Sequence, residues 1–382
     1  MRKLRILQTN NHRGGWGGQP NRILIKSKGL IDRGHFVIIA APRNSTLVQR
    51  AKVKGVPTYD DLEFSRKFSL FNKINEVRKI RNLIEVNEID IVHTHGSQDT
   101  WIAATAAIFS HRKPVVIRTR HNTFPISAHF FNRLLYRKMI DRVIAVSSGV
   151  VKIFEENKLV PYNSIKIISS SVEMERFLSV DNGAEIRKEF GIGMDTLLIG
   201  MVGRFAREKG HEVLLSAAKA VVSKRPDAKF ILAGEGPEEE NIKKKAIQMN
   251  IGKSVVFAGF RTDIPKFLAA LDIFVLTPVA GESLGTAILE AFAMKKPVVA
   301  SDLGGINTSV RHGKTGFLFK PGDSEELAEK LVELIEDSSL RKRFGEAGRK
   351  MIEEEFTKER MVALTEELYF EELEKRETKI VR

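Results

Sequence analysis

Residues 272–301 read DIFVLTPVAGESLGTAILEAFAMKKPVVAS, and this stretch contains the pattern that decides the fold. An apolar run, DIFVLTP, ends in a glycine-containing turn, a helical stretch follows, and a second apolar run, PVVAS, ends the stretch. Short, nearly continuous Val/Ile/Leu runs are typical of strands that are buried on both faces of a parallel sheet. A strand, a helix and a second strand in this order predict one parallel βαβ unit.

The same alternation repeats along the chain of 382 residues. The strands expected in the first half are LRILQ (4–8), HFVIIAA (35–41), IDIVHTH (89–95), PVVIRTR (114–120) and RVIAVS (142–147). Those expected in the second half are LLIGMVG (197–203), KFILAG (229–234), SVVFAGF (254–260), DIFVLTP (272–278) and PVVAS (297–301). The length suits two domains. We therefore predict an α/β protein with two doubly wound, Rossmann-like domains over residues 1–175 and 185–356. The last helix, over about 357–382, has an apolar stripe suited to packing back on the first domain.

Composition narrows the class of protein further. The chain contains no cysteine, which excludes disulfides and thiolate chemistry and suits a reducing compartment. Its start, MRKLRILQTNN, lacks the apolar segment of a signal peptide, and no stretch approaches the roughly 20 apolar residues of a membrane span. We expect a cytoplasmic protein, peripheral at most at the inner face of a membrane.

The net charge of +14 is unevenly distributed along the chain. Residues 1–171 contain 29 Lys and Arg against 12 Asp and Glu, whereas the remaining 211 residues contain 33 against 36. This imbalance suggests that the N-terminal half meets an anionic partner, such as nucleic acid, anionic lipid or a phosphorylated acceptor. General solubility, or a source that lives at high temperature, is the alternative explanation.

Residues 203–210, GRFAREKG, follow a predicted strand and lead into a predicted helix. Gly203, Arg204 and Lys209 in this position would put two cations beside free backbone N–H groups at the start of a helix. Such an arrangement binds a diphosphate, with Arg as a fixed fork of donors and Lys as a mobile point charge. The alternative is a pair of solvated charges in a surface loop.

The turn and helix around Glu282 are more specific. A helix that begins near Ser283 would point the N–H groups of Leu284 and Gly285 at an anion. Glu282 and Glu290 are eight positions apart, which is about 12 Å along an ideal helix. A glycosidase needs its two carboxylates within roughly 5–9.5 Å across one bond, so the spacing disfavours hydrolysis. It suits a ligand with a sugar on one side of a diphosphate and a ribose on the other.

These motifs together resemble the retaining glycosyltransferases of family 4, a group that includes bacterial cell-envelope and lipopolysaccharide enzymes. The resemblance rests on Glu282 with Glu290, Gly203-Arg204 with Lys209-Gly210, Gly304-Gly305, and Gly313 with Gly316. Further similar positions are Gly17-Gly18, Gly34-His35, 90–95, Ser147-Ser148, Gly234 with Gly236, and 259–261. The family's fold, called GT-B, has two Rossmann-like domains facing a central cleft. The resemblance implies transfer of a hexose-type sugar from a UDP- or GDP-sugar to a hydroxyl of an acceptor.

The resemblance also implies roles for single residues. Arg204 and Lys209 would neutralise the departing diphosphate, Glu282 would bind hydroxyls of the transferred sugar, and His121 would lie near that sugar; these four form the expected catalytic set. The expected donor-binding residues are Gly17, Gly18, Gly203, Arg204, Lys209, Phe260, Arg261, Glu282, Ser283, Leu284, Gly285, Thr286 and Glu290. Glu290 would hold the ribose, and the loop of Phe260 and Arg261 would border the base. The run Gly14-Gly15-Trp16-Gly17-Gly18 contains more glycines than the family pattern, so which glycine contacts phosphate stays open.

No residue stands out as a covalent nucleophile, and no cofactor is expected. The resemblance implies that the leaving group departs and the acceptor attacks on one face of the sugar, with the phosphate as base. We expect no metal, because Arg204 and Lys209 supply the positive charge and His93 and His95 lack a third ligand at suitable spacing. We expect His93 and His95 to line the acceptor cleft.

Two segments of the first half alternate apolar and basic residues, over 63–84 and 128–142. Helices of this composition bind anionic membranes, although an ordinary surface helix packed on its sheet is the alternative. We predict an anionic glycolipid or lipopolysaccharide-type acceptor. A soluble acceptor, or a sugar-nucleotide epimerase that uses the same donor without an acceptor, remains the alternative.

Two other classes fit less well. A nicotinamide dehydrogenase needs an acidic residue after its second strand, where this chain has 40–43, AAPR. A nucleic-acid-binding protein would explain neither the acidic second half nor the small number of Trp and Tyr residues available for base stacking. We therefore expect no nucleic-acid partner.

Overall fold

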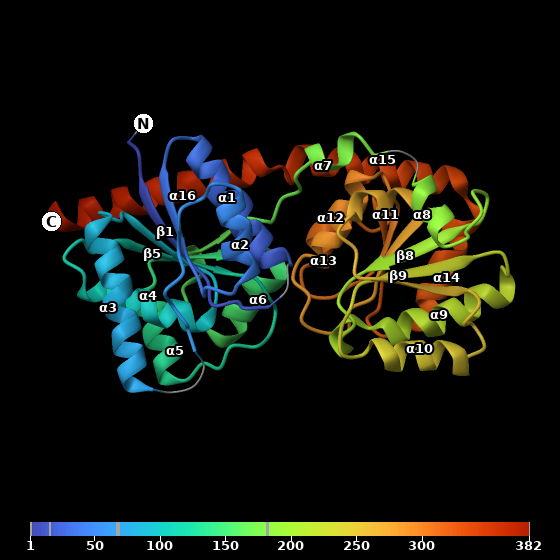
Figure 1. Cartoon of the computed structure of the whole chain (residues 1–382), viewed down its shortest axis with the longest axis horizontal. Helices are drawn as coiled ribbons and strands as arrows, with labels where there is room; N and C mark the ends of the chain where they lie inside the picture. The colour runs from blue at the N-terminus through green and yellow to red at the C-terminus, as the bar shows by residue number, and fades with distance from the viewer. Residues whose placement is uncertain (1, 15–16, 66–68, 181–182, 382) are drawn as a thin grey trace. The chain divides into compact units, whose positions relative to one another are not determined.

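The computed structural model describes residues 2–14, 17–65, 69–180 and 183–381, which divide into two compact units (Figure 1). The first unit comprises Met1–Ser170 and Lys358–Arg382, and the second comprises Ser171–Thr357. The second unit begins before the expected boundary at residue 175 because Val172 pairs with Thr357 and Phe177 is buried in the core of the second unit. The C-terminal helix belongs to the first unit. Asp181 and Asn182, in the expected linker, lie outside the described residues.

The first unit is built on a parallel sheet with the strand order β3-β2-β1-β4-β5-β6-β7. Its strands are β1 (Arg5–Thr9), β2 (Phe36–Ala40), β3 (Thr58–Tyr59), β4 (Ile91–Thr94), β5 (Val115–Arg120), β6 (Arg142–Ala145) and β7 (Ile165–Ile167). Successive side chains of a strand point to opposite faces, so Ile6 and Leu7 enter different cores. The near-continuous apolar strands thus bury both faces of the sheet, as the sequence predicts.

Helices cover both faces of this sheet. One core contains residues of α1 and α16, and the opposite core contains residues of α3, α4 and α6. Figure 1 shows α16 alongside α1, where the two helices pack against each other. The bounds are α1 (Gly18–Asp32), α2 (Thr46–Val53), α3 (Leu70–Val86), α4 (Ser97–Phe109), α5 (Phe130–Leu134), α6 (Ser148–Asn157) and α16 (Lys358–Val381). A π-helical turn, Leu135–Met139, continues α5, and a 3-10 turn, Tyr162–Ser164, precedes β7.

The second unit has a parallel sheet in the order β10-β9-β8-β11-β12-β13. Its strands are β8 (Leu198–Val202), β9 (Lys229–Ala233), β10 (Val255–Gly259), β11 (Ile273–Leu276), β12 (Val298–Ser301) and β13 (Gly316–Phe319). Within this unit α9 packs on α14 and α12 packs on α15. The helices are α7 (Glu175–Leu178), α8 (Ala184–Glu189), α9 (His211–Lys224), α10 (Glu239–Gln248), α11 (Ile264–Ala270), α12 (Thr286–Ala293), α13 (Ile306–Ser309), α14 (Ser324–Glu336) and α15 (Ser338–Glu355), with a 3-10 turn at Arg207–Lys209.

Each sheet contains a point where the strand order reverses, between β1 and β4 in the first unit and between β8 and β11 in the second. Ligands of open α/β sheets bind beside such a point, at the carboxyl ends of the strands. The motif 203–210 follows β8, and the segment 277–285 follows β11. The topology therefore brings the two motifs of the predicted donor site to one place. Across the described residues, no helix combines the length and the apolar character needed to cross a membrane.

Candidate functional site

The loops after β8 and β11 are locked together by hydrogen bonds and by one glycine. Val279 N–H donates to the carbonyl of Glu208 (2.9 Å), and the Thr277 hydroxyl donates to the carbonyls of Lys209 (3.2 Å) and Gly210 (3.0 Å). Gly210 has a φ of +64°, and a Cβ at this position would lie 2.0 Å from the Thr277 carbonyl oxygen. Only glycine therefore permits this close approach.

The approach of the two loops brings Lys209 and Glu282 into contact. Lys209 Nζ donates to Glu282 Oε2 at 2.6 Å, and Glu282 Oε1 accepts hydrogen bonds from the N–H groups of Ser283 and Gly285, both at 3.2 Å. The two side chains are 27% and 14% exposed. Burial raises the pKa of Glu282, but the Lys209 ammonium and the backbone donors outweigh burial and leave this pKa below its usual value. Glu282 is therefore an ionised carboxylate that a ligand can reach.

The start of α12 corrects one prediction. The helix begins at Thr286 rather than near Ser283, because Gly285 has a φ of +67° and lies at the N-cap instead of in the helix. The Gly285 N–H, which we expected to be free for a phosphate, donates to Glu282. Glu282 lies before the helix, so its separation from Glu290 does not follow from the rise of one helix.

Glu290 projects from α12 toward a cation that the sequence did not reveal. Its Oε1 lies 3.8 Å from the guanidinium of Arg176, in the short helix α7. Burial raises the pKa of Glu290; Arg176 opposes this and Glu173 adds to it. Arg176 is more than a hundred positions from Glu290 in the sequence and belongs to no motif, so only the fold brings the two residues together.

The loop that carries Gly203 and Arg204 packs against the next loop of the sheet. Phe205 N–H donates to the Glu235 carbonyl at 3.0 Å, and a Cβ at Gly234 would lie 1.9 Å from the Gly203 carbonyl oxygen. The loop is therefore fixed by backbone contacts, while the Arg204 side chain is exposed. The loop after β8 therefore carries an exposed cation, Arg204, in addition to Lys209.

Phe260 and Arg261 follow β10 and differ in what they offer a ligand. Arg261 makes a two-fold hydrogen-bonded pair with Asp263 (2.8 and 2.6 Å) and a third bond to Glu189 (2.5 Å). These partners raise its pKa, and they use its donors within the protein. Phe260 is 58% exposed, so it is the side chain of this loop that can stack against a base.

The residues predicted in the first half lie at the carboxyl end of the first sheet. Gly17 has an extended conformation at the N-cap of α1, a Cβ there would have no neighbour within 4 Å, and Gly18 begins the helix. Gly15 and Trp16 of the same run lie outside the described residues. His121 follows β5, and its Nε2 lies 2.9 Å from His95 Nδ1. Burial, together with Arg22 and Lys26, lowers the pKa of His121 well below its usual range.

The structure corrects the expectation for His93 and His95. Both side chains are buried, at 0% and 3% exposure, so they lie inside the first unit and do not line a surface. His93 contacts Tyr369 of α16, which the sequence could not indicate because the two residues are far apart along the chain. The described residues contain no group of three or more His, Cys, Asp or Glu placed to hold a metal ion.

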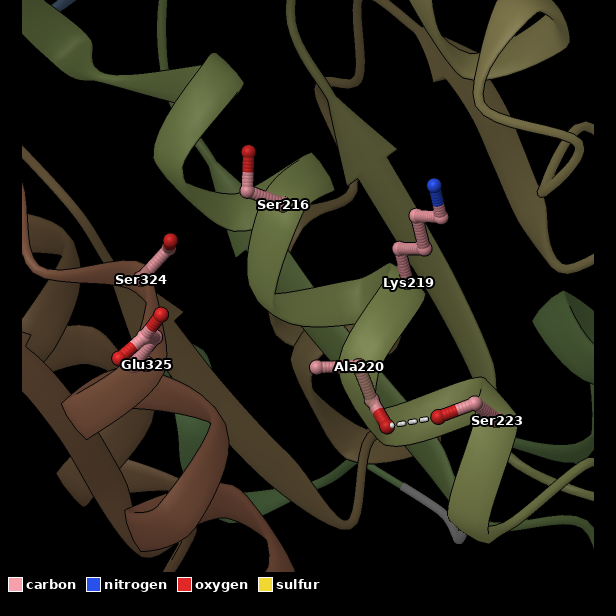
Figure 2. Close-up of a pocket in the computed structure, with 6 residues that line it drawn as sticks. All are labelled: Ser216, Lys219, Ala220, Ser223, Ser324 and Glu325. Atoms are coloured by element: carbon pink, nitrogen blue, oxygen red, sulfur yellow. Dashed lines mark hydrogen bonds between the residues drawn. The ribbon is translucent and has the colours of Figure 1, made fainter.

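A surface hollow between α9 and α14 lies apart from these residues. Figure 2 shows its lining of small polar and charged side chains, with the Ser223 hydroxyl bonded to the Ala220 carbonyl at 2.8 Å. The lining residues are Ser216, Lys219, Ala220, Ser223, Ser324 and Glu325. None of the predicted site residues belongs to this hollow, which follows the body of α9 instead of its N-terminal end at Gly210.

Two Rossmann-like units, with the predicted donor-site loops at the strand-order reversal of the second unit, are the architecture of GT-B glycosyltransferases. A solved glycosyltransferase from Rickettsia africae ESF-5 has this fold, with a TM-score of 0.88 and 24% identity, covering 98% of this chain and 99% of that chain. Residues 16–176 match the family described as Glycosyltransferase Family 4, and residues 182–351 match Glycosyl transferases group 1. The chain belongs to the glycosyltransferases that combine these two domains.

Two of the similar curated proteins are bacterial enzymes. The N-acetyl-alpha-D-glucosaminyl L-malate synthase of Bacillus anthracis is 28% identical over 91% of this chain and 92% of its own length. The UDP-Gal:alpha-D-GlcNAc-diphosphoundecaprenol alpha-1,3-galactosyltransferase of Escherichia coli is 28% identical over 72% of this chain and 74% of its own length. The predictions of a glycosyltransferase and of the GT-B fold are therefore confirmed.

Proposed function

We propose that this chain is a retaining glycosyltransferase that moves a hexose-type sugar from a UDP- or GDP-sugar to a hydroxyl of an anionic acceptor. The observation that carries the proposal is the contact of Lys209 with Glu282 at the strand-order reversal of the second unit. A cation and an ionised carboxylate side by side match a ligand that has a diphosphate next to a sugar rich in hydroxyl groups.

In this mechanism the cations act on the leaving group. As the bond between the sugar and the diphosphate breaks, negative charge grows on the phosphate oxygens, and Lys209 and Arg204 stabilise it. Glu282 accepts hydrogen bonds from hydroxyls of the sugar and fixes its orientation, and Glu290 binds the ribose. The acceptor attacks from the face that the diphosphate leaves, and a phosphate oxygen takes the acceptor's proton.

The donor can be identified by ligand binding followed by product analysis. A nucleotide sugar that binds only the folded chain raises its melting temperature, so a thermal-shift panel of UDP- and GDP-sugars selects the donor. Proton NMR of the product then shows whether the anomeric configuration is kept. An inverted product would contradict retention, and an epimerised nucleotide sugar formed without an acceptor would support the epimerase alternative.

Undiminished transfer in EDTA is expected, since Lys209 and Arg204 take the place of a metal ion.

The excess of basic residues in the first unit supports an anionic acceptor. Residues 1–170 with 358–382, the first unit, contain 35 Lys and Arg against 19 Asp and Glu, so the returning helix leaves the basic excess almost unchanged. The two relatives described above carry acidic acceptors in their names, L-malate in one and a lipid-linked diphosphate in the other. An anionic acceptor is the property common to both, and the choice between a soluble and a lipid-linked one depends on the surface of the first unit.

Exposed apolar side chains on α3 and α5 favour the lipid-linked acceptor. Leu70 and Phe71 at the start of α3 are 62% and 77% exposed, and Phe130 and Phe131 on α5 are 71% and 63% exposed. Basic residues accompany them on both segments, including Arg78, Arg133 and Lys138. Arg66, Lys67 and Phe68 of the predicted basic segment lie outside the described residues. We propose that these helices rest on the anionic inner face of the membrane, where a glycolipid or lipopolysaccharide-type precursor is reached.

Sedimentation with liposomes tests this surface. The wild-type chain should bind vesicles that contain anionic phospholipid and dissociate as salt rises, and the double variant Phe130→Ser/Phe131→Ser should bind more weakly. Val53→Ser is the matched control, since Val53 is 88% exposed but lies on α2. Binding that depends on neither anionic lipid nor salt would contradict the proposal and favour a soluble acceptor.

A further inference from the structure

A network of buried polar side chains connects α16 to His121 at the predicted site. Gln8 of β1, His93 of β4 and Tyr369 of α16 are completely buried, and His95 is 3% exposed. The network lies between the sheet and α16, and its hydrogen bonds run from the Tyr369 hydroxyl to His121. Because each of these groups must donate or accept in a fixed direction, the position of each proton can be deduced in turn.

The deduction starts at Tyr369. Burial raises the pKa of this phenol, so it keeps its proton. Its oxygen accepts a hydrogen bond from Gln8 Nε2 at 3.2 Å, and its hydroxyl donates to His93 Nδ1 at 2.5 Å. His93 therefore carries its proton on Nε2, which donates to the Thr119 hydroxyl at 2.6 Å.

The orientation of the Gln8 amide in turn determines which nitrogen of His95 carries the proton. With its Nε2 turned to Tyr369, its Oε1 faces His95 Nε2 at 2.8 Å and can only accept. His95 thus carries its proton on Nε2, which leaves Nδ1 with a lone pair. His121 Nε2 lies 2.9 Å from that Nδ1, so His121 must donate and holds its own proton on Nε2. His121 Nδ1 is then the acceptor nitrogen of the ring.

The backbone of His95 is held as firmly as its ring. Asp99, fully buried at the start of α4, accepts hydrogen bonds from His95 N–H at 3.0 Å and from the Thr9 hydroxyl at 2.9 Å. Lys26 Nζ approaches His93 Nδ1 (3.1 Å) and His95 Nε2 (3.3 Å) at longer range. Burial and Arg22 lower the pKa of Lys26 well below its usual range, which favours the neutral amine, whose N–H groups and lone pair would match either neighbour.

We propose that Tyr369 is a positioning residue, which acts through Gln8 and His95 to fix His121 as the neutral tautomer with its proton on Nε2. This tautomer presents Nδ1 to the donor sugar as an acceptor for a hydroxyl hydrogen. The inference rests on the proposed function in one respect, the use of a donor sugar, and on the expectation from the resemblance that His121 lies near that sugar.

Burial lowers the pKa of His121 well below its usual range, which favours the neutral ring. Arg22 and Lys26 on α1 and Arg118 and Arg120 on β5 add to this lowering, and His95, directly after β4, lies beside the ring. A second proton on His121 would lie in a buried site close to the guanidinium groups of Arg22, Arg118 and Arg120, so the choice left to the protein is which nitrogen holds the single proton.

Long-range proton–nitrogen NMR spectra of the full chain, labelled with 15N-histidine, measure this choice directly. The signals of His121 can be assigned with the variant His121→Gln. In the wild-type chain without donor, the spectra should show one His121 tautomer, protonated on Nε2, at every pH from about 5.5 to 8.5. A His121 ring protonated on Nδ1, or one that gains a second proton in this range, would overturn the inference. The measurement needs no turnover, so its result is independent of whether the proposed transfer reaction is correct.

Variants of the network test which residues set the tautomer of His121. Tyr369→Phe and Gln8→Met remove single members of the chain and should give a mixture of His121 tautomers. His95→Asn, which keeps an acceptor near the Nδ1 position, should preserve the Nε2 tautomer better than His95→Leu does. Leu368→Met is the control, because Leu368 is buried beside Tyr369 in the same core but belongs to no hydrogen bond of the chain. An unchanged tautomer in both Tyr369→Phe and Gln8→Met would refute the role of α16.

Activity gives a second readout once the donor is known. Loss of one oriented hydrogen bond to a sugar hydroxyl should lower kcat/KM by about tenfold in Tyr369→Phe. A merely structural role for Tyr369 would instead lower stability, as in Leu368→Met, with neither the tautomer nor kcat/KM changed.

Discussion

The contact of Lys209 with Glu282 and the buried histidines of the first unit use ionisable side chains in opposite ways. Lys209 and Glu282 are partly exposed and carry opposite charges, and backbone N–H groups add to the stabilisation of the carboxylate. His93 and His95 are buried among basic groups, and burial, followed by Lys26, lowers their pKa values well below the usual range. The comparison teaches that this chain keeps charge where a charged ligand is expected and suppresses charge where hydrogen-bond direction matters.

The largest expected effect on activity comes from removing the charged side chains of Lys209 and Glu282. Lys209→Ala and Glu282→Ala should each lower the rate of sugar transfer by about 100- to 1,000-fold, because each removes an electrostatic interaction with the reacting donor. Steady-state kinetics with circular dichroism of the same samples would check that the fold is kept. The double variant should lower the transfer rate by less than the product of the two single-variant factors, since the two residues interact directly.

The control for these variants is Lys219→Ala. Lys219 is an exposed lysine on α9, the helix that follows Lys209, and it lines the hollow shown in Figure 2. Transfer should be unchanged in this variant. Wild-type rates in Lys209→Ala or Glu282→Ala would remove these residues from the site.

The buried histidines His93 and His95 predict that the folded chain loses stability in acid. The pKa values of His93 and His95 are lower in the folded chain than in the unfolded chain, where they lie near 6.5. Below about pH 6.5 the unfolded chain therefore binds protons that the folded chain does not, and the free energy of unfolding falls as pH falls. The slope approaches about 1.4 kcal/mol per pH unit for each of the two histidines.

Urea unfolding between pH 5 and 7.5 measures this slope. Trp101 lies on α4 of the first unit, so its fluorescence reports on that unit. His93→Gln removes one of the two titrating histidines. It should therefore reduce the slope of the unfolding free energy against pH by about 1.4 kcal/mol per pH unit. Stability that is independent of pH in the wild-type chain below pH 6.5 would show that these histidines are charged in the fold.

A smaller effect should sharpen the comparison at Glu290, whose side chain is 23% exposed, whose pKa is raised by burial, and which is predicted to bind the donor. Glu290→Gln keeps the shape of the side chain and removes its charge, so KM for the donor should rise about tenfold with little change in kcat. Arg176→Met should raise KM less, because it leaves the carboxyl group but removes the cation that favours its ionised form. Equal KM values for wild type and Glu290→Gln would show that Glu290 does not bind the donor.

Much of the fold was predictable from the sequence because parallel strands buried on both faces leave a strong local pattern. The run DIFVLTP, for example, predicts β11, and the glycines around residue 285 predict the turn after it. The start of α12 was predicted wrongly, since Gly285 is compatible with a helix N-terminus in sequence but has a left-handed conformation in the fold.

The candidate site was predictable only where its residues belong to motifs. Lys209 and Glu282 were both recognised, but their contact depends on two loops meeting at the reversal of strand order. Arg176 and Tyr369 carry no local signal, because they reach Glu290 and His93 through packing of elements that are distant in the sequence. Periodicity identifies the elements, whereas long-range contacts of this kind require the three-dimensional arrangement.

The placement of α16 has a consequence for how the protein is made. The first unit begins with residue 1 but is completed only by Lys358–Arg382, after the whole second unit has been synthesised. At roughly 5–20 residues per second, the ribosome needs on the order of 10–40 seconds to make the second unit. During this time the apolar face that α16 will cover stays open on the nascent chain. The first unit is therefore the one whose apolar face stays exposed until translation ends, and Tyr369 reaches its histidine among the last contacts to form.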